Sequence, residues 1–251
     1  MTFLEAAING ARPPADHAGL PVTPAEQART AAACRDQGAD AVHAHVRDDD
    51  GRETLTAGAV GALIRAVRAA APALPVGIST GAWIVPDPEA RAGHVRRWRE
   101  RPDFASVNFD EPGAADVAGA LLALGVGVEA GLASPAAAEA FVASRLAPRC
   151  LRVLLEPQEE AVPVALATTA SIEQVLSGAG IALPRLLHGT GVTTWPLLAE
   201  AARRGCQARI GLEDTLLLPG GEPASDNAAL VAAARRMLAD ASRALGAKRD
   251  A

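Results

Sequence analysis

Two histidines separated by a single residue, His43 and His45, stand at the end of a short apolar segment. Residues 41–45 are typical of a buried strand, in which side chains two positions apart point to the same face of the sheet. Neutral imidazoles are common ligands of zinc and other transition metals. The pair therefore predicts most of a metal site at the end of this strand, and a third ligand must come from elsewhere in the chain.

Short β-like segments alternate with longer helical segments along all 251 residues. Eight strand–helix units with short connections predict a single (β/α)8 TIM barrel over residues 1–251. A doubly wound open sheet is the main alternative, but no GxGxxG pattern follows the first segment. The expected strands are residues 4–8, 41–45, 75–78, 104–107, 127–129, 151–155, 186–188 and 208–212. The expected helices are residues 24–37, 57–71, 88–99, 114–124, 135–145, 162–176, 194–204 and 227–245.

Polar residues gather at the carboxyl ends of these predicted strands. In a parallel barrel all such ends meet at one face, where barrel enzymes place their chemistry. We therefore expect an active face there, and the Gly- and Pro-rich loop at residues 216–226 could cover it. The residues concerned are Asn9, His43, His45, Ser79, Thr80, Asn108, Glu129, Glu156, His188, Glu213 and Asp214.

Most of these residues also have a purely structural interpretation. The segment 79–81 can form a turn, asparagines can bond loop backbone, and an acidic pair can precede a helix. His188 fits a buried, hydrogen-bonded histidine at least as well as a ligand. The histidine pair is harder to explain by packing, and its best third ligand is Glu213, ahead of Glu156 and Glu129. Two imidazoles with one carboxylate suit catalytic zinc, and a similar set binds non-haem iron.

The composition restricts the class of partner. The net charge is −5, the single lysine is Lys248, and the arginines are dispersed. We therefore expect no nucleic-acid partner and no membrane-surface binding, while small anionic substrates remain possible. Three separated cysteines without a CxxC motif, no signal-peptide pattern and no long apolar run indicate a cytoplasmic protein with reduced thiols.

Several of these segments together resemble one enzyme family, the β-keto acid cleavage enzymes. The similarity covers nearly the whole chain, and the combination of HxHxRD with RxGxED is specific although neither motif is alone. The matching segments are residues 6–11 (AAINGA), 43–48 (HAHVRD) with Gly51, 78–81 (ISTG), 106–108 (SVN), 209–214 (RIGLED) and 225–227 (SDN) with Leu230 and Val231.

The resemblance implies a zinc-bearing barrel, usually a homo-oligomer, that converts a β-keto acid and acetyl-CoA into acetoacetate and a new acyl-CoA. It implies that His43, His45 and Glu213 hold Zn²⁺. Zinc would polarise the keto oxygen as a Lewis acid, and a base would initiate attack on acetyl-CoA. The resemblance also implies that Arg209 and Asp214 form the catalytic pair and that Glu129 is a further site residue. The residues that it implies bind or orient the keto acid are Ser79, Thr80, Ser106, Asn108 and Asn9.

The chain departs from the family pattern in two respects. The connections after the fourth and sixth predicted strands are short and acidic, which bears on the use of acetyl-CoA. Position 12 is Arg where some relatives carry an acid, so we expect Arg12 to favour a substrate with an anionic or polar tail. Two alternatives follow: a metal-dependent hydrolase or lyase acting on a small carboxylate, with Glu156 and His188 as acid and base, or a barrel that binds a carboxylate without turnover.

Overall fold

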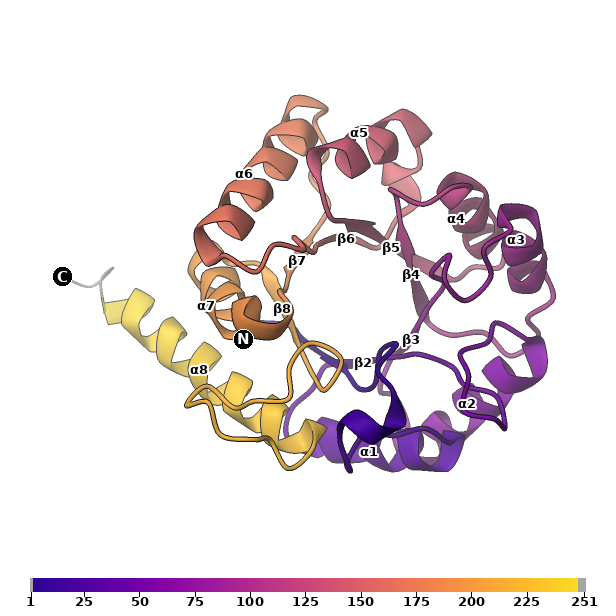
Figure 1. Cartoon of the computed structure of the whole chain (residues 1–251). Helices are drawn as coiled ribbons and strands as arrows, with labels where there is room; N and C mark the ends of the chain where they lie inside the picture. Colours follow the sequence, from indigo (N-terminus) through magenta and orange to yellow (C-terminus); the bar gives the residue numbers. More distant parts are fainter. Residues whose placement is uncertain (1, 248–251) are drawn as a thin grey trace.

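Eight parallel strands close into one barrel in chain order, with β1 paired to both β2 and β8. The computed structural model, which describes residues 2–247, confirms the predicted (β/α)8 TIM barrel (Figure 1). The strands are β1 (Leu4–Ala7), β2 (Ala41–Ala44), β3 (Val76–Ser79), β4 (Phe104–Asn108), β5 (Gly127–Leu132), β6 (Arg152–Leu155), β7 (Arg185–Leu187) and β8 (Gln207–Ile210).

The helices form an outer ring around the barrel (Figure 1). Local signals set where they begin: α1 starts with a capping box between Thr23 and Glu26 and with Pro24 in its first turn. Most helix ends lie within one or two residues of the predicted positions. The helices are α1 (Pro24–Asp36), α2 (Ala57–Ala70), α3 (Pro88–Arg96), α4 (Ala114–Ala123), α5 (Pro135–Ser144), α6 (Val162–Gly178), α7 (Thr194–Arg204) and α8 (Asn227–Ala247), and short 3₁₀ turns cover Pro14–Asp16, Ala147–Arg149 and Gly191–Thr193.

The barrel interior below the strand ends holds charged side chains as well as apolar ones. Glu5 and Glu129 are fully buried, and Glu129 forms an ion pair of 2.9 Å with Arg152. Arg152 also donates to Gln207 and lies over the Phe3 ring. Glu5, Glu129 and His43 each offer a ligand atom, and these atoms lie within 4.8 Å of one another, so the buried cluster continues directly to the histidine pair at the end of β2.

The prediction that Glu129 lies at a strand end is wrong. Strand β5 continues to Leu132, three residues beyond the expected end, so Glu129 lies in the middle of the strand. The sequence after Glu129 is Ala-Gly-Leu-Ala, and a glycine inside a strand often marks a bulge or bend. In the structure Gly131 pairs with Asn108 of β4 and with Leu154 of β6 and remains part of the ladder.

None of the helices between residues 2 and 247 is long and apolar enough to cross a membrane. The three cysteines are unpaired thiols, with Cys34 and Cys150 buried and Cys206 partly buried. Burial raises the pKa of Cys34 to about 12 and that of Cys150 to about 11, which keeps both thiols protonated. These cysteines therefore contribute to packing.

Candidate metal centre and pocket

A cavity of about 690 Å³ opens at the carboxyl ends of the strands. Its lining brings together residues from β2, β3, β4, β6, β7 and β8 and from the loop after β1. Of the predicted site residues it includes Arg12, His43, His45, Ser79, Ser106, Asn108, Arg209 and Glu213, and also Glu156 and His188. Asn9, Thr80, Glu129 and Asp214 lie outside the lining, and so does the whole loop at 216–226, which was expected to cover the site.

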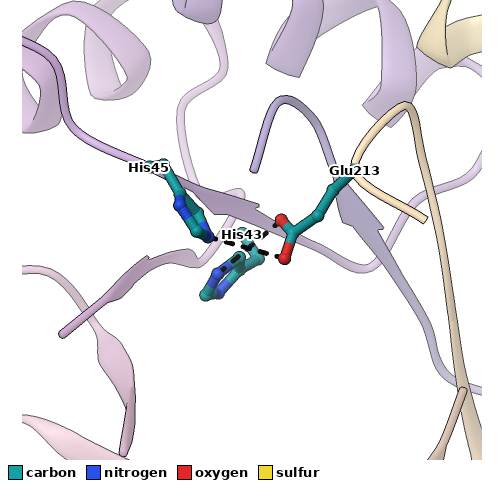
Figure 2. A group of neighbouring side chains, drawn as sticks. All are labelled: His43, His45 and Glu213. Atoms are coloured by element: carbon teal, nitrogen blue, oxygen red, sulfur yellow. Dashed lines mark ion pairs between the residues drawn. The ribbon is translucent and has the colours of Figure 1, made fainter. Parts of the chain in front are cut away.

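His43, His45 and Glu213 converge on one point of this cavity, although Glu213 is 168 positions after His45 in the chain (Figure 2). Glu213 Oε2 lies 4.0 Å from His43 Nε2, and Glu213 Oε1 lies 3.5 Å from His45 Nε2. Donor atoms of a tetrahedral zinc site with bonds of about 2.1 Å are separated by about 3.4 Å. The observed separations are close to that value, so the three residues fit a metal ion.

The protonation states of His43 and Glu213 support the same conclusion. Burial acts to lower the pKa of His45, but Glu213 and Glu53 raise it to about 9, so a metal ion would have to displace the proton of this imidazole. Burial above all lowers the pKa of His43 to about 3, which leaves a neutral imidazole able to coordinate. Burial acts to raise the pKa of Glu213, but Arg209 and His45 hold it well below its usual range. Glu213 Oε2 is buried and has no hydrogen-bond partner within the described chain. A buried, ionised and unpartnered carboxylate oxygen between two imidazoles is a donor set suited to a cation.

Glu53 and Trp83 support His45 and were not predicted from the sequence. Glu53 Oε1 lies 2.5 Å from His45 Nδ1, and the Trp83 indole N–H donates to both oxygens of Glu53 at 3.1 and 3.0 Å. The Trp83 ring also stacks over His45, with 6.0 Å between the centroids. A carboxylate on the far nitrogen of a ligating histidine fixes its orientation and raises its basicity. His45 is thus presented with Nε2 toward Glu213.

Backbone contacts explain why the motifs have their particular residues. The Asn9 side chain accepts from His45 N–H at 2.8 Å and donates to the carbonyls of His45 and Pro21. In the same way, the Asn227 side chain accepts a hydrogen bond from the Leu212 N–H and donates one to the Ile8 carbonyl. Asn9 thus holds the end of β2 instead of meeting the pocket, which corrects its expected role toward the substrate.

Gly10 makes room for Glu213. Its φ is +59°, and a Cβ at this position would lie 2.5 Å from Glu213 Cγ. A side chain there would therefore be strained and would displace the carboxylate. Arg47 of the HxHxRD motif donates to the carbonyls of Gly10, Arg12 and Gly51 at 2.7–2.9 Å, so the loops after β1 and β2 are held together.

Arg209 connects the metal centre to Asp214. One guanidinium nitrogen donates to Asp214 Oδ1 at 2.6 Å and to Glu213 Oε1 at 3.0 Å. Asp214 is fully buried, and this burial raises its pKa even though Arg209 opposes the shift. Its other oxygen, Oδ2, has no hydrogen-bond partner among residues 2–247. Arg209 thus lies between this carboxylate and the cavity.

Hydroxyl and amide groups of β3 and β4 line the cavity beside the metal centre. Ser79 and Ser106 are paired residues on adjacent strands, and Asn108 follows two positions along β4. Asn108 Nδ2 donates to Glu111, whose carboxylate also lies 3.4 Å from Arg91. The Thr80 hydroxyl donates instead to the Ser106 carbonyl at 2.7 Å. Because its hydroxyl is committed to that bond, Thr80 supports β4, which corrects its expected substrate contact.

Arg12 lies at the rim of the cavity, over the loop that carries Glu213. Its Nε donates to the Leu212 carbonyl at 2.6 Å, and its Nη1 lies 3.9 Å from Asp16. The guanidinium is therefore oriented by the protein but keeps further N–H groups for a ligand.

Glu156 and His188 form the opposite side of the cavity, from β6 and β7. Glu156 Oε2 lies 3.5 Å from His188 Nε2, and His188 Nδ1 lies 3.7 Å from Asp214 Oδ1. Burial raises the pKa of Glu156 to about 7 and lowers the pKa of His188 to about 4. His188 is therefore a neutral imidazole, and Glu156 is a carboxyl group that can exchange its proton near neutral pH.

Solved structures similar to this chain share the barrel at low sequence identity. The binary complex of ObcA with oxaloacetate matches with a TM-score of 0.73 and 18% identity, covering 89% of this chain. This chain spans only 64% of that protein's length. The tryptophan synthase alpha chain from Legionella pneumophila subsp. pneumophila matches with a TM-score of 0.62 and 15% identity, covering 95% of this chain and 92% of the other. At these identities the structural matches show the fold alone.

A second comparison is with the sequence profiles of protein families. The profile described as beta-keto acid cleavage enzyme matches residues 1–145 and 158–251, which is nearly the whole chain. The matched residues include His43, His45, Arg209, Glu213 and Asp214, whose side chains converge at one end of the barrel. The interval between the two matched parts contains β6 and Glu156. This chain therefore belongs to the beta-keto acid cleavage enzyme family, whose members break carbon–carbon bonds.

Proposed function

We propose that the protein is a zinc-dependent enzyme that cleaves a β-keto acid with acetyl-CoA, giving acetoacetate and a new acyl-CoA. The observation that carries this proposal is the convergence of His43, His45 and Glu213 in one cavity, with the Arg209–Asp214 pair directly beside them. A barrel that only binds a carboxylate has no use for a buried acid–base pair next to a metal site. Family membership supports the same reaction class.

His43, His45 and Glu213 would hold the metal, with Glu53 fixing the orientation of His45. When bound, zinc would act as a Lewis acid toward the keto oxygen and stabilise negative charge that develops there. Three protein ligands are the number typical of catalytic zinc sites, which keep one position open for substrate.

Asp214 is the proposed base that takes a proton from C2 of the keto acid. Its unpartnered Oδ2 can accept that proton, while Arg209 holds Oδ1 and sets the carboxylate's orientation. Because Arg209 lines the cavity and lies over the fully buried Asp214, the guanidinium would have to move toward a bound substrate anion for Oδ2 to reach C2. General-base catalysis of this kind contributes about 10²- to 10⁴-fold in rate.

Ser79, Ser106 and Asn108 are the proposed partners of the substrate's carboxylate and carbonyl oxygens. Their polar groups line the cavity between the metal centre and the opposite side. Such donors stabilise negative charge where it develops during the reaction. Arg12 would face the far end of the substrate and favour an anionic tail. The oxaloacetate bound to ObcA, which is itself a dianionic keto acid, supports this choice.

Metal analysis combined with a substrate panel tests the proposal. The purified protein should contain about one zinc per chain, and with acetyl-CoA it should form acetoacetate from at least one β-keto acid. His45→Ala should lose both the metal and the activity. Zinc at full occupancy with no acetoacetate from any substrate would contradict the acyl-transfer reaction, and a metal-free active enzyme would contradict the metal site.

We also propose that the protein assembles as a homo-oligomer, as the family resemblance implies. Val192 and Leu217 are large apolar side chains that are 71% and 46% exposed, a feature found at interfaces between subunits. Sedimentation or light scattering would give the mass directly, and a monomer at all concentrations would contradict the proposal.

A further inference from the structure

The pair formed by Glu156 and His188 has no part in the reaction proposed above. In that reaction Asp214 is the base, and three other residues hold the metal. Glu156 and His188 nevertheless both line the same cavity, and their side chains are 15% and 2% exposed. A carboxyl group placed at a cavity wall, with no structural partner to hold it there, requires its own explanation.

The surroundings of Glu156 leave it without a cationic partner. Within residues 2–247 its one ion-pair contact is with His188, and burial keeps that imidazole neutral. The charged groups that face it are Arg209, which favours its ionised form, and Asp110 and Glu213, which oppose it. A charge-neutral neighbour and two nearby carboxylates are conditions under which a glutamate accepts and returns a proton, as a general base must.

The fold makes a specific space for this carboxyl group. A Cβ at Gly131 of β5 would lie 2.4 Å from Glu156 Oε1 and 2.7 Å from Asn108 Oδ1. The absence of a side chain at position 131 thus allows Glu156 and Asn108 to approach each other over the middle of β5. This places the Glu156 carboxyl beside the amide proposed to hold the substrate, at the wall of the substrate cavity.

We propose that Glu156 is a second general base that activates water, giving the enzyme a hydrolytic cleavage of its β-keto acid that needs no acetyl-CoA. The inference rests on the proposed function in one respect, namely that the keto group of a β-keto acid occupies this cavity. Glu156 itself lies in the interval that the family profile does not match.

The chemistry balances with water as the only co-reactant. Glu156 removes a proton from water, and the remaining hydroxide adds to the keto carbon. The bond between that carbon and C2 then breaks, and its electron pair takes the proton back from Glu156. One β-keto acid and one water thus yield acetate and the carboxylic acid of the remaining acyl group, with Glu156 returned to its starting state. No oxidant or reductant is required.

The experiment uses the zinc-loaded full chain with 3-oxoadipate, whose tail is anionic, and with 3-oxohexanoate, whose tail is neutral. Without acetyl-CoA, we expect acetate and the second acid in equal amounts, measured by chromatography so that spontaneous decarboxylation does not count. Glu156→Gln should lower this hydrolysis at least about 100-fold more than it lowers acetoacetate formation with acetyl-CoA. Its zinc content and thermal unfolding should equal those of the wild type.

Glu160→Gln is the matched control, because Glu160 lies in the same loop, is exposed and lies outside the cavity lining. It should hydrolyse the substrates at the wild-type rate. Acetoacetate formation without any hydrolysis, or equal hydrolysis by Glu156→Gln and the wild type, would overturn the inference and leave the proposed function standing. If neither reaction occurs with either substrate, both proposals fail.

Discussion

The two sides of the cavity are built on different principles. On the metal side, formed by the ends of β1, β2 and β8, side chains from outside the cavity hold the backbone or the imidazole of the ligands: Asn9, Glu53 and Asn227. On the opposite side, formed by the ends of β6 and β7, both nitrogens of His188 lack hydrogen-bond partners within the described chain. On the metal side, hydrogen bonds thus hold His45 and the backbone next to the proposed ligands, although His43 Nδ1 lacks a partner in the described residues. On the opposite side, neither nitrogen of His188 is held by such a bond among these residues.

This difference follows the extent of the family match only for β6, because β7 and His188 of the opposite side lie in a matched segment. The metal side comes from matched segments, while β6 and Glu156 lie in the interval between them. A site that must hold a metal tolerates little change, because the ligand geometry and its supporting hydrogen bonds act together. The opposite side has no such constraint, and a chain-specific reactivity can therefore arise there.

The largest expected effect comes from replacing one buried histidine by alanine on each side of the cavity, in two separate variants. His43→Ala should abolish zinc binding, because it removes one of three ligands. His188→Ala, an equally buried histidine at the end of β7, should keep one zinc per chain. Elemental analysis of both variants after dialysis provides the measurement. Loss of zinc from the His188 variant would mean that the two sides are a single site.

Asp214→Asn should come next in size. The amide keeps the shape and still accepts from Arg209, but it cannot take a proton, so kcat/KM for acetoacetate formation should fall by about 10²- to 10⁴-fold. The zinc content should stay unchanged, because the ligands are intact. Steady-state kinetics at saturating acetyl-CoA measures the effect. A variant with wild-type kcat/KM would exclude Asp214 as the base.

Glu53→Gln tests how much the support of His45 on the metal side contributes. Loss of the carboxylate behind His45 should weaken zinc binding by about 10- to 100-fold. Glu111→Gln is the comparison, because Glu111 is also a carboxylate at the cavity but contacts Arg91 and Asn108 instead of a ligand. Competition with a zinc chelator gives both affinities. Equal affinities in the two variants would show that the support of His45 is unimportant.

The pH dependence should distinguish the two sides. A base acts in its ionised form, and the pKa of Glu156 is raised to about 7, so hydrolysis should increase as the pH rises through 7 and then level off. The groups that face Glu156 and could modify this profile are His188, Asp110, Arg209 and Glu213. In Glu156→Gln the residual hydrolysis should lack this step. A wild-type hydrolysis rate that falls as the pH rises through 7 would contradict the role of a base.

The smallest effect is expected for Arg12→Ala. One exposed charge contact to the substrate tail contributes at most about fivefold in KM, so KM should rise by up to that factor for 3-oxoadipate and stay constant for 3-oxohexanoate. The measurement is KM for each substrate in both proteins. An equal rise for both substrates would mean that Arg12 only orders the loop after β1.

The sequence predicted those parts of the site that depend on strand periodicity and motif spacing. The alternation of strand and helix segments predicted the barrel, and the alternation of side chains in a strand predicted the shared face of His43 and His45. The family motifs added Glu213 to this pair. Glu53 and Trp83 could not be found in this way, because their approach to His45 depends on the shape of two loops. The bridge between Arg47 and Glu53 is what turns Glu53 back toward β2.

The errors have one common cause. Asn9 and Thr80 follow the ends of β1 and β3, whereas Glu129 lies inside β5. The sequence does not show whether such a polar side chain faces the cavity, the backbone or the barrel core. Asn9 and Thr80 satisfy backbone groups, and Glu129 pairs with Arg152 in the interior. A small shift of a residue along its strand decides whether the side chain bonds to backbone or faces the cavity. Residue spacing in the sequence does not show that shift.

Arg47 has a consequence for engineering this protein. Because its guanidinium is shared by carbonyls of the loop bearing Arg12 and of the loop after β2, neither loop is an independent module. Replacing the loop after β1 by that of a relative, in order to change which substrate tails bind, would also perturb the turn that carries Glu53. Transplants intended to alter selectivity should therefore exchange residues 9–13 and 46–53 as one unit.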